Sequence, residues 1–282
     1  MTDTEAAPVR FAAPEDGVPS ADMREALERD GFLILEKFAS PEACAALMER
    51  AVEISGDVDP GASVFSTRDQ AQGRDRYFLE SGDKIRCFFE EDEKAVNKIG
   101  HAMHDLDPVY AGFSRDPRLE RLVTGLVPMR PLLLQSMHIF KHAQVGGEVT
   151  CHQDASFLFT EPASVLGLWF ALEPATTDNG CLFAHPGAHR GPLRARYRRV
   201  SESEARLETL DASPWPSTPP VALEVDAGAL IVLHGFLPHF SGPNRSDRSR
   251  QAYTLHVIDG EAVYPSDNWL RRPEAFPLRG FV

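Results

Sequence analysis

The sequence has few of the features that mark specialised classes of protein. Its 282 residues include four cysteines without a Cys-x-x-Cys pair, which disfavours a disulfide framework or a zinc ribbon and indicates free thiols. The N-terminus has neither the basic nor the apolar stretch of a signal peptide. The longest apolar run without charge, residues 227–244, holds three glycines and two prolines, which excludes a transmembrane helix. We therefore expect a cytoplasmic protein that has no membrane partner.

Positive charge is also scarce. Lys and Arg number 29 against 42 Asp and Glu, so the formal net charge is −13. A chain of this charge has no overall positive field to attract phosphates, which argues against binding to nucleic acid or to an anionic membrane. Apolar residues make up 43% of the chain, an ordinary globular share, and the length allows one large domain or two small ones.

Helix patterns come first along the chain and strand patterns later. Residues 1–20 have no periodicity and are expected to form a flexible tail. Helices are predicted at residues 21–30, 40–55, 93–113 and 116–126. Strands are predicted at residues 32–38, 76–80, 85–90, 132–141, 156–160, 165–173, 181–185, 221–225, 230–234 and 251–258. Since helices and strands do not alternate, we expect a mainly β sandwich or barrel with N-terminal helices rather than a doubly wound sheet.

Residues 190–220 have no strand pattern, which inside a compact domain is typical of a functional loop, and we expect a lid-like insertion there. Part of it, residues 201–210, could form one helix. The segment begins with a group of arginines that either receives an anionic substrate or is a solvated charged run: Arg190, Arg194, Arg196, Arg198 and Arg199.

The motif His152-Gln-Asp154 carries the clearest chemical signal. In an extended strand, residues two apart point to the same side, so this imidazole and this carboxylate converge on one point. Two histidines and a carboxylate form the facial triad of non-haem Fe(II) oxygenases. His234 and His239 are both candidates for the third ligand.

Arg250 lies eleven residues beyond His239 and suits a second requirement of this chemistry. Oxidation at such a centre uses a co-substrate, 2-oxoglutarate, that chelates iron at one end and needs a cationic anchor for its distal carboxylate. The planar guanidinium of arginine binds a carboxylate through two charge-assisted hydrogen bonds. The position of Arg250 therefore favours His239 over His234 as the third ligand.

Eight short segments between about residue 22 and Trp269 form a specific combination. They are Asp30-Gly-Phe32, Gly82-Asp-Lys-Ile-Arg86, Gln135-Ser-Met-His-Ile-Phe-Lys141, Gly146-Gly-Glu-Val-Thr150, His152-Gln-Asp-Ala-Ser-Phe-Leu158, Asn179-Gly-Cys-Leu182, Pro186-Gly-Ala-His189 and Ser246-Asp-Arg-Ser-Arg-Gln-Ala-Tyr253. This combination resembles the phytanoyl-CoA dioxygenase family of Fe(II)/2-oxoglutarate oxygenases, and within it the animal phytanoyl-CoA dioxygenase domain-containing proteins.

The resemblance implies a double-stranded β-helix, a cupin-like jelly roll, with its core at about residues 130–260 of a single domain spanning residues 21–282. It implies an iron site formed by His152, Asp154 and His239. It also implies contacts with 2-oxoglutarate at Arg250, Ser241, Lys84, Met137 and Trp169. Fe(II), 2-oxoglutarate and O2 are the expected cofactor and co-substrates, with ascorbate as an optional stimulant.

Two departures from the family pattern leave these groups in place. Cys151 stands before the first implied iron ligand, where close relatives tend to have proline, and Ala188 replaces the serine of the commoner Pro-Gly-Ser-His segment. Asp154 is retained, which argues against the halogenase branch, because there the carboxylate is lost to make room for a halide.

The resemblance predicts a dioxygenase that hydroxylates a small organic molecule and converts 2-oxoglutarate to succinate and CO2. Two other functions stay open at this point. One is a cupin-like module that binds a metal or a ligand without catalysis, and the formation of succinate would distinguish the two. The other is a metal-dependent hydrolase on the same barrel, which needs a general base beside a metal-bound water and would be active without O2.

Overall fold

A computed structural model describes residues 7–56, 63–64, 71–90 and 95–282, and in it two β-sheets enclose a cavity. The larger sheet has eight strands in the order β1 (Arg10–Ala12), β2 (Phe32–Glu36), β12 (Leu230–His234), β7 (Leu166–Ala171), β14 (Arg250–Asp259), β5 (Pro131–Lys141), β4 (Val96–His101) and β3 (Ile85–Phe89). The smaller sheet has four strands in the order β11 (Val221–Leu223), β8 (Leu182–Ala184), β13 (His239–Ser241) and β6 (Val149–His152). Within these sheets, neighbouring strands run antiparallel except for β1 and β2.

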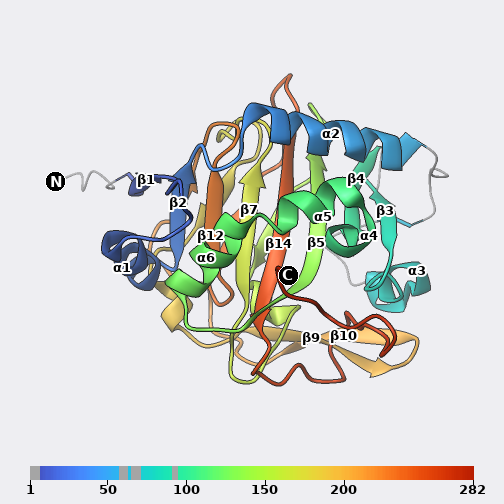
Figure 1. Ribbon diagram of the computed structural model, residues 1–282. Helices are drawn as coiled ribbons and strands as arrows, with labels where there is room; N and C mark the ends of the chain where they lie inside the picture. The colour runs from blue at the N-terminus through green and yellow to red at the C-terminus, as the bar shows by residue number, and fades with distance from the viewer. Residues whose placement is uncertain (1–6, 57–62, 65–70, 91–94) are drawn as a thin grey trace.

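Helices α2 (Pro41–Gly56), α5 (Pro108–Ser114) and α6 (Pro117–Leu126) cover one face of the larger sheet, in front of β12, β7, β14 and β5 (Figure 1). The other helical segments are α1 (Ala21–Asp30), η1 (Ala71–Arg74), α3 (Arg76–Leu79), α4 (Met103–Leu106), η2 (Asp154–Ser156) and η3 (Ala188–Arg190). The predicted mainly β class with N-terminal helices is confirmed. Among the described residues, no helix is long and apolar enough to cross a membrane.

The helix α6 shows how the sequence defines these elements. Asp116 caps it by accepting a hydrogen bond from the backbone N–H of Arg118, and Pro117 occupies the first turn, where no N–H is needed. Its apolar residues recur at three- and four-residue spacing and are buried against the sheet: Leu119, Leu122, Val123 and Leu126. Burial of this face fixes the helix against the sheet.

The two faces of β14 have different environments. Tyr253, Leu255 and Val257 join the core beneath the helices, whereas Arg250 and His256 line the cavity between the sheets. This alternation follows from the two-residue period of a strand. The helix-covered face therefore stabilises the sheet, and the opposite face is left for a functional site.

Three predictions of secondary structure are wrong. The strand predicted at residues 76–80 is instead α3, Arg76–Leu79, because the Asp75 side chain caps the N–H of Tyr77 at 2.8 Å. The described part of the helix predicted at 93–113 contains β4, α4 and α5, and the last of these begins at Pro108, directly after its N-cap residue Asp107. The strand predicted at 156–160 is η2 followed by irregular chain.

The helix considered at residues 201–210 is also wrong. This segment belongs to a hairpin of β9 (Ala195–Ser201) and β10 (Glu204–Thr209), which lies outside both sheets. An ion pair of 2.5 Å between Arg198 Nε and Glu208 Oε2 joins the two strands. At the other end of the chain, part of the expected tail, Arg10–Ala12, forms β1 and pairs with β2.

The arginines at residues 190–199 all have acceptors within the protein. Arg194, Arg196 and Arg198 form ion pairs with Asp211, Asp267 and Glu208. Arg199 is buried and donates to backbone carbonyls, and Arg190 donates to the carbonyl of Glu28. Because these cations are already paired or bound, their positions favour a structural role over the binding of an anionic substrate.

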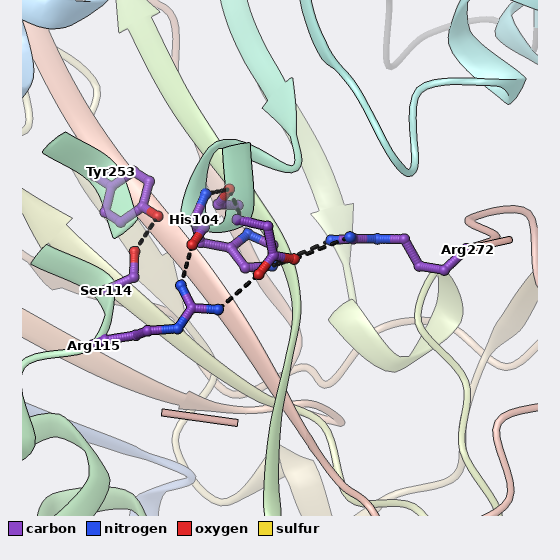
Figure 2. Close-up of polar contacts among 7 residues, drawn as sticks. His104, Ser114, Arg115, Tyr253 and Arg272 are labelled. Carbon is purple, nitrogen blue, oxygen red and sulfur yellow. Dashed lines mark hydrogen bonds and ion pairs between the residues drawn. The ribbon is translucent and has the colours of Figure 1, made fainter. Parts of the chain in front are cut away.

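A buried ionic cluster fastens the C-terminal segment to the sheet and to α4 (Figure 2). The carboxylate of Asp105 accepts from Arg115 at 2.6 Å and from Arg272 at 3.0 Å. His104 lies 2.8 Å from the hydroxyl of Ser136 on β5. The Asp105 side chain is 1% exposed and that of Arg272 is 5% exposed, so this ion pair is shielded from solvent. The contacts anchor the chain at Arg272, three residues beyond Trp269, which lines the cavity.

Candidate metal centre and co-substrate pocket

The structure brings together the three side chains expected to bind iron. His152 ends β6 and His239 begins β13, and these two residues are directly paired across the strands. Asp154 follows at the start of η2. Its Oδ1 lies 3.5 Å from Nε2 of His152 and 3.7 Å from Nε2 of His239. Ligand atoms of all three residues lie within 4.8 Å of one another.

Both imidazoles are oriented by a backbone carbonyl. Nδ1 of His152 lies 2.8 Å from the carbonyl of Thr150, and Nδ1 of His239 lies 3.0 Å from that of Leu237. A carbonyl can only accept, so each Nδ1 carries the hydrogen and each Nε2 presents a lone pair. Burial lowers the pKa of His239 to about 4, which keeps its ring neutral at pH 7. Two imidazoles and one carboxylate are a donor set that fits Fe(II).

The second oxygen of the Asp154 carboxylate is held by His256 on β14. Its Oδ2 lies 3.3 Å from Nε2 of His256, so Oδ1 remains directed at the two histidines of the cluster. On β7, a Cβ at Gly167 would lie 2.9 Å from the same Oδ2, and glycine is needed for this close approach. Burial tends to raise the pKa of Asp154, but His239 and His256 outweigh it and hold the pKa well below its usual value.

The cluster lies at the wall of a cavity of about 300 Å³. Residues that are paired across neighbouring strands line this cavity side by side, in rows. Trp169, Thr254 and Met137 are neighbours on β7, β14 and β5, and the next row along the same face is Gly167, His256 and Gln135. Arg250 begins β14 on this face. Along the strand, the order is therefore Arg250, then the row of Thr254, then the row that contacts the metal cluster.

Arg250 supplies a buried cation at the far end of this cavity. The residue is 1% exposed, and its Nη2 donates to the carbonyl of Gly180 at 3.0 Å. Its Nε and Nη1 have no hydrogen-bond partner among the described residues. Burial lowers the pKa of Arg250 to about 10, which still leaves the guanidinium charged at pH 7. A buried cation with two unused donors fits the distal carboxylate of 2-oxoglutarate.

Three of the four other expected co-substrate contacts line the same cavity: Ser241, Met137 and Trp169. The guanidinium of Arg250 lies 5.5 Å from the centre of the Trp169 ring, which forms one wall beside it. Ser241 is 2% exposed and lies two residues beyond His239 on β13. The expected pocket therefore extends from β13 to the larger sheet.

Lys84 does not line the cavity. Its Nζ lies 2.7 Å from Oδ1 of Asp83, and its side chain is 44% exposed. The lysine of the cavity wall is Lys98 on β4, which is 7% exposed and faces Ile139. Lys98 lay inside the wrongly predicted helix, so its face could not be assigned from the sequence.

His234, the alternative third ligand, lies apart from the cluster. It ends β12, its Nδ1 accepts from the N–H of Phe236 at 3.1 Å, and its ring centre is 5.0 Å from that of His189. His239 thus has the geometry that His234 lacks.

One residue of the site, His256, was not assigned a role from the sequence, although it shares a strand face with Arg250. Gln135 begins one of the segments that carry the family resemblance but was given no role, and no sequence signal marked Gly167.

Comparisons with known proteins agree with this geometry. The family model described as "Phytanoyl-CoA dioxygenase (PhyH)" matches residues 27–252. Phytanoyl-CoA dioxygenase domain-containing protein 1 of Mus musculus is 42% identical over 274 residues, covering 89% of this chain and 94% of that protein. The predicted family resemblance is confirmed.

Solved structures share the fold. The apo form of EctD from S. alaskensis matches with a TM-score of 0.68 and 22% identity, covering 98% of this chain and 90% of the other. The epimerase SnoN, in complex with Fe3+, alpha ketoglutarate and nogalamycin RO, matches with a TM-score of 0.65 and 16% identity, covering 91% and 97% of the two chains. The expected double-stranded β-helix is thereby confirmed.

Proposed function

This chain belongs to the phytanoyl-CoA dioxygenase family of Fe(II)/2-oxoglutarate-dependent oxygenases, and from that premise we propose that it hydroxylates a small organic molecule. In the proposed reaction, 2-oxoglutarate, O2 and a substrate C–H group give succinate, CO2 and an alcohol. One oxygen atom enters succinate and the other enters the product. The loss of CO2 supplies two electrons to O2, and the C–H bond supplies two more.

The residues of the cavity divide this task. His152, Asp154 and His239 would hold the iron, which when bound supplies the activation of O2. Arg250 would bind the distal carboxylate of 2-oxoglutarate with Ser241 beside it, and so direct the other end of the co-substrate toward the cluster. The single observation that carries the proposal is that the three ligands and the buried Arg250, whose Nε and Nη1 have no partner among the described residues, open into one cavity.

The co-substrate walls follow from the same rows of side chains. Met137 and Trp169 would enclose the chain of 2-oxoglutarate, and Lys98 on β4 lines the same cavity, where burial holds its pKa well below the usual value. The implied contact of Lys84 gains no support from its exposed position. Stimulation by ascorbate and a cytoplasmic location stay predictions.

We also propose that residues 21–282 act as one domain in which the segment at about 190–220 covers the cavity. Tyr197 of β9 and Leu207 of β10 line the cavity, which supports the lid-like role expected from the sequence. The net charge of −13 disfavours a polyanionic partner, in keeping with a small-molecule substrate.

The test is the formation of succinate from 2-oxoglutarate by the purified protein with Fe(II), ascorbate and O2, across a panel of small molecules. His239→Ala should abolish both iron binding and succinate formation, whereas the control His234→Ala should retain both. The proposal is refuted if the protein never converts 2-oxoglutarate to succinate, even in a reaction uncoupled from substrate oxidation. A product formed equally well without O2 would indicate the hydrolase, and iron binding without succinate would indicate the binding module.

A further inference from the structure

We propose that the end of the cavity around Gln135, His101 and Trp269 recognises a small uncharged substrate through an O–H or N–H group close to the C–H bond that reacts. This inference rests on the proposed function, since it names the substrate class of the same site. It follows from three features: an unused amide, an unused acceptor, and aromatic walls.

Gln135 presents the unused amide beside the metal cluster. The residue is 4% exposed and lines the cavity, and its side chain forms no hydrogen bond with any described residue. On the adjacent strand it is paired with His256, whose Nε2 contacts Asp154 at 3.3 Å. A bulge on β5 follows directly: His256 pairs with Gln135, but Val257 pairs with Leu133. Such bulges re-aim side chains next to active sites.

His101 presents the unused acceptor. Its Nδ1 lies 2.7 Å from the hydroxyl of Ser81, and this hydroxyl donates its one hydrogen to the carbonyl of Phe78 at 2.6 Å. The hydroxyl oxygen must therefore accept from Nδ1–H, which leaves Nε2 of His101 with a lone pair. Nε2 is buried and has no partner among the described residues, although His101 lines the cavity. A substrate O–H or N–H group would satisfy it.

Aromatic rings form the walls around these two groups. Trp269 stacks on Phe78 with ring centres 4.4 Å apart and meets the edge of His101 at 5.2 Å. The indole N–H of Trp269 and the hydroxyl of Tyr197 also lack partners in the described part of the chain. The compartment thus combines a flat apolar surface with a few polar atoms, which is typical of sites for small molecules.

Burial around His101 selects an uncharged head group. Gln135, His101 and Trp269 are at most 4% exposed, so a charged group would lose its water there and gain no ionic partner from these three residues. Nε2 of His101 has a lone pair and no hydrogen, so it cannot donate to a carboxylate. A hydroxyl or an amide remains as the group that can use both His101 as acceptor and Gln135 as donor or acceptor.

The experiment compares four compounds with one cyclohexyl body: cyclohexanol, methylcyclohexane, cyclohexylammonium and cyclohexanecarboxylate. Their binding to the protein loaded with Fe(II) and 2-oxoglutarate is measured by calorimetry without O2. Cyclohexanol should bind at least about tenfold more tightly than the other three, since a site built to hydrogen-bond a hydroxyl rejects analogues without it. Gln135→Met, which conserves volume, should reduce the affinity for cyclohexanol to that for methylcyclohexane.

Two further variants keep the test sharp. His101→Phe preserves the ring contacts and should lower cyclohexanol affinity in the same way, even if Gln135→Met does not fold. Gln251→Met makes the matched change on the opposite face of β14 and should retain the preference for cyclohexanol. Equal binding of all four compounds, tighter binding of an ion, or no binding of cyclohexanol would overturn the inference. Succinate formation by the same preparation tests the proposed function separately.

Discussion

Arg250 is the residue whose surroundings most constrain the chemistry of the cavity. Its guanidinium is buried, and two of its nitrogens have no partner among the described residues. A buried, unpaired cation is costly, because the protein does not replace the hydrogen bonds that water would supply. A bound carboxylate would remove this cost, so the co-substrate and the fold stabilise each other at this position.

Arg250→Ala should therefore raise the apparent KM for 2-oxoglutarate by at least about 30-fold, because truncating one partner of a buried charged pair costs about 2 kcal/mol or more. The affinity for iron should change much less. Steady-state succinate formation and a metal titration give the two quantities. Arg248→Ala is the matched control, because Arg248 is exposed and only two residues away. Equal effects of Arg250→Ala on both quantities would place Arg250 outside the co-substrate site.

The His-x-Asp spacing predicted that His152 and Asp154 would converge, and they do, although Asp154 lies in η2 rather than on the strand. The position of Arg250 favoured His239, which lies beside these two residues. Other residues of the site could not be found in this way. Gln135 and Gly167 reach the cluster through the pairing of β5, β14 and β7, which are far apart in sequence. Their roles depend on cross-strand register, and register is not visible in a single segment.

At the scale of elements, the strands of the barrel core were largely predictable and the segments around it were not. In the run at 251–258, side chains of two different kinds alternate, as expected for a strand whose two faces have different buried surroundings. This run forms most of β14. The segment 93–113 contains helix-forming residues, but its first described part pairs with β3 and β5 as β4. Tertiary pairing overrides local preference in such cases. The same applies to β10, which pairs with β9.

The ionic cluster of Figure 2 gives a prediction for the C-terminal segment. Arg272→Met should lower the free energy of unfolding by about 3 kcal/mol, because it removes one partner of a buried ion pair and leaves Asp105 less compensated. Urea denaturation measures the change. The control Arg271→Met removes the exposed pair with Glu202 and should cost less than about 1 kcal/mol. Similar costs for the two variants would contradict a structural role for the buried cluster.

At the scale of the whole molecule, acid should destabilise the fold partly through His138. Nδ1 of this buried ring lies 2.8 Å from the hydroxyl of Tyr110, its Nε2 lies 2.9 Å from Oε1 of Gln251, and burial lowers its pKa to about 4. The unfolded chain takes up a proton near pH 6.5 and the folded protein only near pH 4. Stability is therefore unaffected above pH 6.5 and falls as the pH drops from about 6.5 to 4, by up to about 3 kcal/mol.

The measurement is the free energy of unfolding of the wild type and of His138→Asn at several pH values. The wild type should lose more stability than the variant between pH 6.5 and pH 4, and the two curves should run parallel above pH 6.5. Parallel curves over the whole pH range would show that His138 is not responsible for the loss of stability in acid.

The net charge of the molecule is a poor guide to its cavity. The chain carries −13 overall, yet Arg250 places a buried cationic group in the cavity wall. Charge averaged over the chain describes the outer surface, which sets solubility and long-range attraction. The local field in a shielded site is set by a few side chains whose positions depend on the fold.

The two ends of the cavity are built by different parts of the chain. The iron ligands and Arg250 belong to the paired sheets or adjoin them, whereas Phe78, Tyr197 and Trp269 come from α3, the β9–β10 hairpin and the C-terminal segment. Insertions or substitutions in these outer segments can change which molecule is accepted without altering the jelly roll. Libraries for laboratory evolution toward new substrates can therefore combine these three segments with Gln135 and His101, while the metal cluster and Arg250 are kept constant.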